Sequence, residues 1–261
     1  MEIRQLAGAL GAEVIGLDLT RGIDGSAFSA VRDALHKSGV ICIRDQGAMT
    51  PEDQLAFAGN WGEISIHPYV PSIEGYPGIM KIYDPNPITQ TWHSDSTHMR
   101  HPHAYTLLLA RVLPKVGGDT MFASAVKAFE SLSPGLQEAL RALSAVHEGT
   151  SLAAEAGLEH EAVVAVHPMV RAHPDTGAEA LFVNDNYVTR IDGWTPAESR
   201  PLLEFLYGVI GRYENTYRHR WRHGDLVIWD NRSTQHAVVG DVSGEERVLH
   251  RVTIASSASD V

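Results

Sequence analysis

Residues 91–95 read TWHSD and place a histidine two positions before an aspartate. Side chains alternate along an extended segment, so His93 and Asp95 project to the same face and offer two ligands to a metal ion. A third ligand must come from elsewhere in the chain. The best-placed candidate is His236, at the end of residues 229–236, which read WDNRSTQH. The sequence therefore predicts that two distant segments meet at one site.

Two histidines and one carboxylate on one side of a metal, with open positions opposite, form the facial triad of non-haem Fe(II) oxygenases. The pattern needs support from the rest of the chain, because 14 histidines are present and such pairs often serve as surface or hydrogen-bonded residues. The same three ligands also suit a zinc hydrolase, in which water takes the fourth position.

The composition is that of an ordinary globular protein. The chain has 261 residues, of which 44% are hydrophobic and 20% charged, enough to bury a substantial core. The net charge is −11 without any lysine and arginine block, so nucleic acid and anionic membranes are disfavoured as partners. The single cysteine, Cys42, lies in an apolar run and is interpreted as a small buried hydrophobe. No signal peptide or run of ~18 apolar residues is found, so we expect a cytoplasmic protein.

The first part of the chain, about residues 1–78, is predicted to be a mixed α/β lead-in. Two short strands open it, and a helix follows whose apolar residues recur at helical spacing up to Gly39. A strand is expected at residues 40–44. A second helix begins at residues 50–53, where a capping hydroxyl, a proline and two acids occur together.

From residue 79 onward, short β-like runs broken by proline and glycine dominate the chain. Two helices interrupt them, one expected over residues 126–143 and one after a capping box at residues 195–198. This pattern predicts a mainly β fold with flanking helices and a jelly-roll or other double-sheet core. No repeat or linker divides the chain, so one domain is expected over residues 1–261. The expected strands cover residues 79–83, 105–112, 120–123, 145–147, 163–166, 180–183, 216–222, 226–229 and 248–254.

The last predicted strand carries Arg247 and Arg251 on one face. A half-exposed strand with its arginines in water is the simpler interpretation. If the strand belongs to a barrel covered by helices, the two side chains instead face inward and can hold carboxylates, which the planar guanidinium group suits well. The sequence leaves both alternatives open.

Seven short blocks of sequence occur along the chain. They are RDQ at residues 44–46, IHP at 66–68, WHSD at 92–95, GGDT at 117–120, FVN at 182–184, WDNRSTQH at 229–236 and LHR at 249–251. Together these blocks resemble the Fe(II)- and 2-oxoglutarate-dependent dioxygenases of the taurine dioxygenase and 2,4-dichlorophenoxyacetate dioxygenase family. The resemblance covers nearly the full length of the chain.

The resemblance implies a double-stranded β-helix (jelly-roll, cupin-like) core with a catalytic iron bound by His93, Asp95 and His236. It also implies that Thr120 and Arg247 bind the distal carboxylate of 2-oxoglutarate. The implied activity is hydroxylation of an aliphatic C–H group, coupled to decarboxylation of 2-oxoglutarate to succinate and CO2, with O2 as the other cosubstrate.

The substrate implied by the resemblance is a small anion. His67 and Arg251 match positions that hold the sulfonate in the taurine enzyme, although the arginine also fits a role in supporting the cosubstrate. Three pocket positions differ from the taurine enzyme: Thr89 replaces an asparagine, Val70 a tyrosine and Tyr187 a phenylalanine. We therefore expect a different anion, such as another sulfonate, a sulfate ester, an aryloxyalkanoate or a phosphorylated metabolite.

A short lid is expected at about residues 149–165, and its small size favours a bulkier substrate than taurine. Relatives commonly form dimers or tetramers, so a homo-oligomer is expected. Two alternatives remain, a zinc-dependent hydrolase and a non-catalytic jelly-roll binding protein. The first leaves Thr120 and Arg247 without a role, and the second predicts a broken triad, which this sequence does not have.

Overall fold

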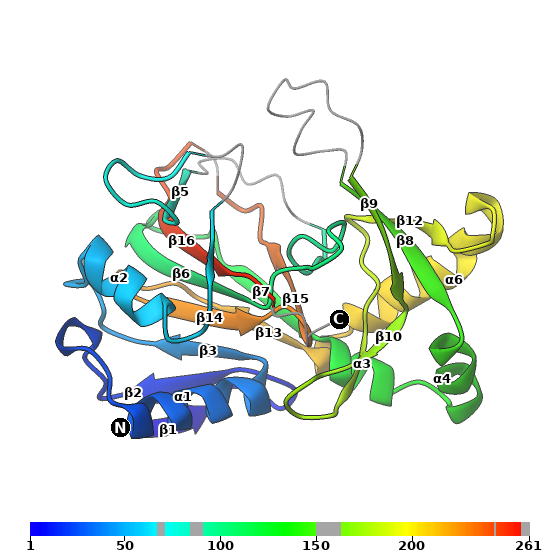
Figure 1. Ribbon diagram of the computed structural model, residues 1–261, viewed down its shortest axis with the longest axis horizontal. Coiled ribbons are helices and arrows are strands. Elements are labelled where there is room, and N and C mark those ends of the chain that lie inside the picture. The colour runs from blue at the N-terminus through cyan, green and yellow to red at the C-terminus, as the bar shows by residue number, and fades with distance from the viewer. Residues whose placement is uncertain (67–70, 84–90, 150–162, 243, 257–261) are drawn as a thin grey trace.

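The computed structural model describes residues 1–66, 71–83, 91–149, 163–242 and 244–256. Strands predominate in these ranges and helices flank them, which confirms the predicted mainly β class (Figure 1). Among the described residues, no helix is both long enough and apolar enough to cross a bilayer. Four parts of the sequence predictions lie outside the described ranges: His67, Val70, Thr89 and residues 150–162 of the expected lid.

The first part of the chain extends one edge of the main sheet. Its elements are β1 (Glu2–Gln5), β2 (Ala12–Ile15), η1 (Leu19–Arg21), α1 (Gly25–Ser38), β3 (Val40–Ile43) and α2 (Pro51–Ala58). β1 and β2 are antiparallel, whereas β2 and β3 are parallel because α1 carries the chain back between them. α1 begins after the capping Asp24, and it ends before Gly39, the predicted stop. α2 begins with a capping box between Thr50 and Asp53.

The main sheet has eight strands and brings together segments that are far apart in the sequence. Its other members are β4 (Ile64–Ser65), β5 (Met80–Tyr83), β6 (Tyr105–Val112), β14 (Leu226–Asp230) and β16 (Val248–Ile254). The order is β1-β2-β3-β14-β6-β16-β4, and β5 also pairs with β16. The strand that carries Arg251 therefore lies beside β6 and only one strand away from β14.

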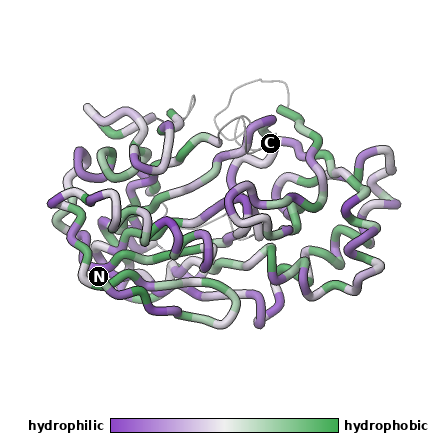
Figure 2. Tube along the Cα trace, turned by 60° about the horizontal axis from the view of Figure 1, so that its bottom comes forward, coloured by the Kyte–Doolittle hydropathy of each residue, from purple (hydrophilic) through white to green (hydrophobic). Residues whose placement is uncertain are grey.

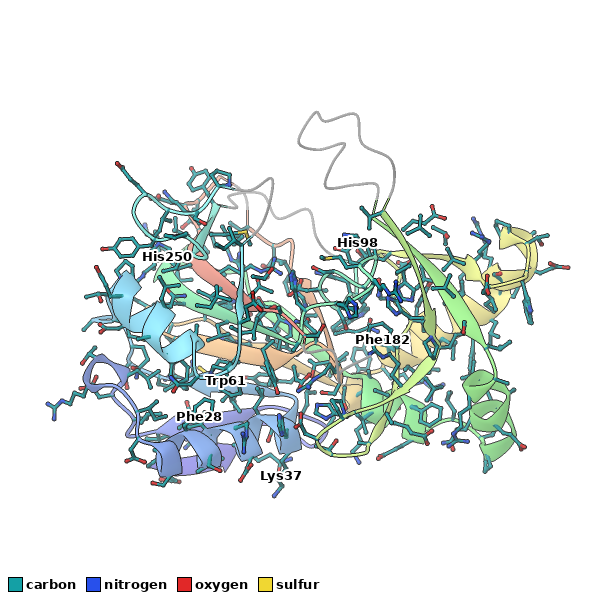
Figure 3. The ribbon with its side chains drawn as sticks, viewed as in Figure 1. Phe28, Lys37, Trp61, His98, Phe182 and His250 are labelled. Atoms are coloured by element: carbon teal, nitrogen blue, oxygen red, sulfur yellow. The ribbon has the colours of Figure 1, made fainter. Side chains whose placement is uncertain are left out.

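Both faces of the main sheet are covered, which explains why β6 is apolar along most of its length. Leu107 and Leu109 pack with α1 and α2 in the outer core, where Phe28 and Trp61 also meet with ring centroids 5.0 Å apart (Figure 3). Leu108 points to the opposite face and belongs to an inner core. Thr106, two residues before Leu108, shares this inner face.

A smaller sheet contributes to the inner core and carries two of the predicted site residues. It consists of β7 (Thr120–Ser124), β13 (Thr216–His219) and β15 (Thr234–Val238), in the order β13-β7-β15. Phe122 of β7 packs with Trp229 of the main sheet at a centroid distance of 5.5 Å. The strand predicted over residues 216–222 ends at His219, because its partner there, Thr120, is the first residue of β7.

The remaining elements form a helical and β region beside the two sheets (Figure 1). They are α3 (Ala125–Glu130), α4 (Pro134–Arg141), β8 (Ser144–Gly149), β9 (Val163–Pro168), β10 (Val170–Ala172), β11 (Glu179–Leu181), β12 (Val188–Ile191), α6 (Pro196–Ile210) and η2 (Tyr213–Asn215). β12, β8 and β9 form one sheet, and β10 and β11 another. Hydrophobic and hydrophilic stretches alternate along α4 and α6, as expected of helices with one buried face (Figure 2).

The single helix predicted over residues 126–143 is wrong, because two helices occupy this region. α3 ends at Glu130 and α4 starts at Pro134, which occupies the first helical position after Ser133. Proline lacks the N–H needed inside a helix, and its ring clashes with the carbonyl four residues earlier. The break therefore follows from Pro134, a signal that was present in the sequence.

Candidate active site

His93, in the segment after residue 90, faces His236 of β15. The N–H of His93 donates to the carbonyl of His236 at 3.1 Å, and the N–H of His236 donates back at 2.8 Å. Oδ1 of Asp95 lies 3.9 Å from Nε2 of His93 and 3.8 Å from Nε2 of His236. All three side chains are buried. The structure therefore brings the predicted trio together, with one potential ligand atom from each residue within 4.8 Å of the others.

The two imidazoles are in the state that metal binding requires. Nδ1 of His93 lies 2.9 Å from the carbonyl oxygen of Thr91, so it carries the proton and leaves the lone pair on Nε2. Burial lowers the pKa of His93, and burial together with the neighbouring His93 lowers that of His236 well below its ordinary value. The ring of Trp229, with its centroid 4.5 Å from that of His236, is part of the apolar wall. Both histidines are therefore neutral near pH 7.

The carboxylate of Asp95 is ionised although it is buried. Burial alone would raise its pKa, but the guanidinium group of Arg251 and the hydrogen bond from Thr106 hold the pKa well below its usual range. Oδ2 accepts a hydrogen bond from Thr106 Oγ1 at 2.6 Å and forms an ion pair with Arg251 Nη2 at 2.8 Å. Oδ1 is the oxygen that faces the two histidines.

Both arginines of the last strand region face the interior rather than water. The side chain of Arg251 is 23% exposed and pairs with Asp95. Arg247 is 2% exposed, and its Nε donates to the carbonyl of Gly118 at 3.1 Å. The inward alternative is therefore the one that the structure supports.

The GGDT block at residues 117–120 contacts Arg247 through Gly118 and ends at Thr120. Gly118 has a φ of 70°, and a Cβ at this position would lie 3.1 Å from Cδ of Arg247, so glycine allows the close approach. Thr120 follows two residues later at the start of β7, where it is buried and accepts a hydrogen bond from Trp221 Nε1 at 3.1 Å. Sequence reasoning missed Trp221, because nothing in its local pattern connects it with Thr120.

A second group of possible metal ligands, His36, His173 and Asp230, does not suit a cation. Nδ1 of His173 accepts hydrogen bonds from the backbone N–H groups of Asp175 at 3.1 Å and Thr176 at 3.3 Å. Nε2 of His173 must therefore carry the proton, which it donates to Asp230 at 2.8 Å. No lone pair of His173 is left for a metal ion.

The third group, Cys42, His219 and Asp225, is also better explained as structural. Burial raises the pKa of the Cys42 thiol, which therefore stays protonated. Oδ2 of Asp225 already accepts from Arg44 Nη1 at 2.5 Å and from the backbone of Arg222 at 2.8 Å. Cys42 is 2% exposed, so the prediction of a small buried hydrophobe is confirmed.

Comparison with known proteins identifies the class to which this fold and site belong. The family model described as "Taurine catabolism dioxygenase TauD, TfdA family" matches residues 2–253. The chain belongs to this family and is a 2-oxoglutarate-dependent dioxygenase, an oxidoreductase that uses Fe(II), 2-oxoglutarate and O2.

Individual relatives cover almost the whole chain. An "Alpha-ketoglutarate-dependent sulfate ester dioxygenase" of Pseudomonas putida is 34% identical over 98% of this chain and 89% of its own length. An "Alkylsulfatase" of Acinetobacter baylyi is 32% identical over 99% and 86%. Among solved structures, a putative alpha-ketoglutarate-dependent taurine dioxygenase from Burkholderia xenovorans has a TM-score of 0.89 and 32% identity, covering 98% of this chain and 93% of its own.

Proposed function

We propose that His93, Asp95 and His236 hold the Fe(II) that this family uses. The support is that one buried cluster combines two neutral imidazole nitrogens with one ionised carboxylate oxygen, which is the ligand set of the facial triad. In the second cluster His173 has no free lone pair, and in the third the Cys42 thiol stays protonated. When bound, the metal supplies the oxidation chemistry, and the chain orients the C–H bond and excludes water.

Arg247 and Thr120 are proposed to bind the distal carboxylate of 2-oxoglutarate. The guanidinium group of Arg247 is buried and held by Gly118, so it is already oriented for a carboxylate. Thr120 contributes a hydroxyl that Trp221 holds in place. Arg247 and Thr120 both lie in the interior, where a bound cosubstrate could also reach the cluster of His93, Asp95 and His236.

The two facing sheets are proposed to form a double-stranded β-helix, or jelly roll, within one domain over residues 1–261. The inner core between the main sheet and the β13-β7-β15 sheet supports this proposal, since side chains from both sheets meet there. The metal-ligand candidates belong to the same interior.

The substrate is proposed to be a small organic anion, with an alkyl sulfate ester as the first choice. Two similar relatives carry the names sulfate ester dioxygenase and alkylsulfatase. Arg251 supplies a partly exposed cation beside Asp95, suited to a sulfate group, and His67 is proposed as a second anion contact. Hydroxylation of the carbon next to the ester oxygen would give an aldehyde and sulfate, together with succinate and CO2 from 2-oxoglutarate and O2.

The test begins with anaerobic addition of Fe(II) and 2-oxoglutarate to the metal-free protein, followed by spectroscopy of the weak visible metal-to-ligand band. We expect the band in the wild type and none in His93→Ala. Hexyl sulfate, taurine and 2,4-dichlorophenoxyacetate are then added in turn, and succinate and released sulfate are measured after O2 is admitted. Taurine as the best substrate would contradict the sulfate ester proposal.

A cytoplasmic location and assembly into a dimer or tetramer are proposed from the sequence. Size-exclusion chromatography with light scattering measures the assembly directly, and a mass equal to one chain would rule out the oligomer. The zinc hydrolase and the non-catalytic binding protein are not favoured by membership of this family.

A further inference from the structure

We propose that Thr106 is a positioning residue that makes the carboxylate of Asp95 bind the metal through a single oxygen. This inference rests on the proposed iron site. Thr106 is 0% exposed and lies on the inner face of β6. It is a polar side chain within an otherwise apolar run, so its hydroxyl needs hydrogen-bond partners in the interior.

The direction of each hydrogen bond around Thr106 is defined by its partners. An ionised carboxylate can only accept, so the Thr106 hydroxyl donates to Asp95 Oδ2 at 2.6 Å. The hydroxyl oxygen of Thr106 in turn accepts a hydrogen bond from Asn231 Nδ2 at 3.1 Å. The Asn231 amide cannot turn over, because its Oδ1 already accepts from the Asp95 backbone N–H at 3.1 Å and from Trp229 Nε1 at 2.9 Å. Two successive hydrogen bonds therefore run in one direction, from Asn231 to Thr106 and from Thr106 to Oδ2 of Asp95.

These hydrogen bonds give the two carboxylate oxygens of Asp95 different roles. Oδ2 is occupied by Thr106 and Arg251, whereas Oδ1 faces Nε2 of His93 and His236. If both oxygens bound the metal, the carboxylate would occupy one of the positions that 2-oxoglutarate and O2 require. Holding Oδ2 away thus keeps these positions open.

Thr106 and Arg251 both contact Oδ2 of Asp95, but they differ in exposure and in their proposed relation to the substrate. Arg251 is partly exposed and is the proposed partner of the anionic substrate, so its contact with Asp95 competes with an incoming anion. Thr106 is fully buried and has no contact with the substrate side in this proposal. It keeps Oδ2 in place throughout turnover, independently of which anion is bound.

The test compares three substitutions. Thr106→Val removes the hydroxyl while keeping the branched shape, and Thr106→Ser keeps the hydroxyl. Ser199→Ala is the matched control, because Ser199 is a buried hydroxyl in α6 that donates to the Thr195 carbonyl at 2.8 Å and accepts from Ile191 N–H at 3.0 Å, away from the metal cluster. Thr106→Ala replaces Thr106→Val if the valine variant does not fold.

Three measurements are made on each folded protein: the Kd for Mn(II) from the EPR signal of the free ion, the position of the anaerobic Fe(II)–2-oxoglutarate band, and Tm. Loss of an outer-shell partner typically weakens metal affinity by ~10–100-fold. We expect this loss and a shifted band in Thr106→Val, near-native values in Thr106→Ser, and native metal binding in Ser199→Ala.

Native Mn(II) affinity and an unshifted band in Thr106→Val, or in Thr106→Ala where that variant is used, would overturn the role of Thr106 while leaving the proposed function intact. A Thr106→Ser variant as weak as Thr106→Val would also overturn it, because the hydroxyl would then not be the cause. No band in the wild type would instead overturn the proposed function, and the role of Thr106 with it.

Discussion

The backbones of His93 and His236 exchange two hydrogen bonds, of 3.1 and 2.8 Å, so the two histidines are fixed opposite each other before any metal binds. Residue 93 is thereby joined to β15, the edge strand of the small sheet. Because the contact is made by the main chain, the separation of the two imidazoles depends on strand register rather than on side-chain rotamers alone.

Removing a metal-ligand candidate should abolish metal binding. His236→Ala leaves two ligands, so we expect the Fe(II)–2-oxoglutarate band to disappear and Mn(II) affinity to fall by more than the ~10–100-fold typical of an outer-shell loss. His36→Gln is the control, because His36 belongs to the cluster that His173 makes unsuitable for metal. Native metal binding in His236→Ala together with a loss in His36→Gln would mean that the wrong cluster has been chosen.

Arg247→Ala should separate cosubstrate binding from metal binding. Losing a buried, oriented cation costs about 2–5 kcal/mol of binding free energy, so the Kd for 2-oxoglutarate should rise at least ~30-fold. Isothermal titration in the presence of Mn(II) measures it, and Mn(II) affinity itself should stay near the native value. If 2-oxoglutarate still binds normally while a zinc-loaded sample hydrolyses esters, the zinc hydrolase becomes the better interpretation.

Gly118→Ala should weaken 2-oxoglutarate binding through Arg247. Gly118 and Gly177 have nearly equal φ values of 70° and 71°, so alanine at either position carries a similar backbone penalty of about 1–2 kcal/mol. A Cβ at Gly118 would meet Cδ of Arg247 at 3.1 Å, whereas one at Gly177 meets nothing within 4 Å. Thermal melts should therefore show a loss in both variants that is at least as large in Gly118→Ala, with a raised Kd for 2-oxoglutarate only in Gly118→Ala. Equal affinities would show that Arg247 tolerates the contact.

Buried His147 should make the metal-free protein less stable in acid. Burial lowers its pKa to about 3, against about 6.5 in the unfolded chain. Above pH 6.5 both states are neutral, so His147 adds no pH dependence there. Between pH 6.5 and 3 the unfolded state binds the extra proton, and the free energy of unfolding falls by about 1.4 kcal/mol per pH unit.

His147→Gln removes this titration, and urea unfolding at pH 6, 5 and 4 checks it. The slope of unfolding free energy against pH should become shallower by about one proton. An unchanged slope would mean that His147 is protonated in the folded protein or that its region unfolds before the rest.

Local signals in the sequence predicted much of the fold. Gly39 ends α1 where the stop is predicted, and the capping residues Thr50 and Thr195 start α2 and α6. These features depend on hydrogen bonds between residues three or four apart, so the sequence around them carries the whole signal. The exception is the break before Pro134, where the structure has two helices instead of the single one predicted.

The sequence by itself determined which residue types gather at the site, because His93 and Asp95 are neighbours on one extended segment and the blocks around them resemble a known family. Only the tertiary structure decided that Thr106 and Asn231 hold the second oxygen of Asp95. The hydrogen bond between these two residues spans 125 positions in the chain. No periodicity encodes such a contact, since it exists only once β6 and the turn after β14 lie side by side in the folded sheet.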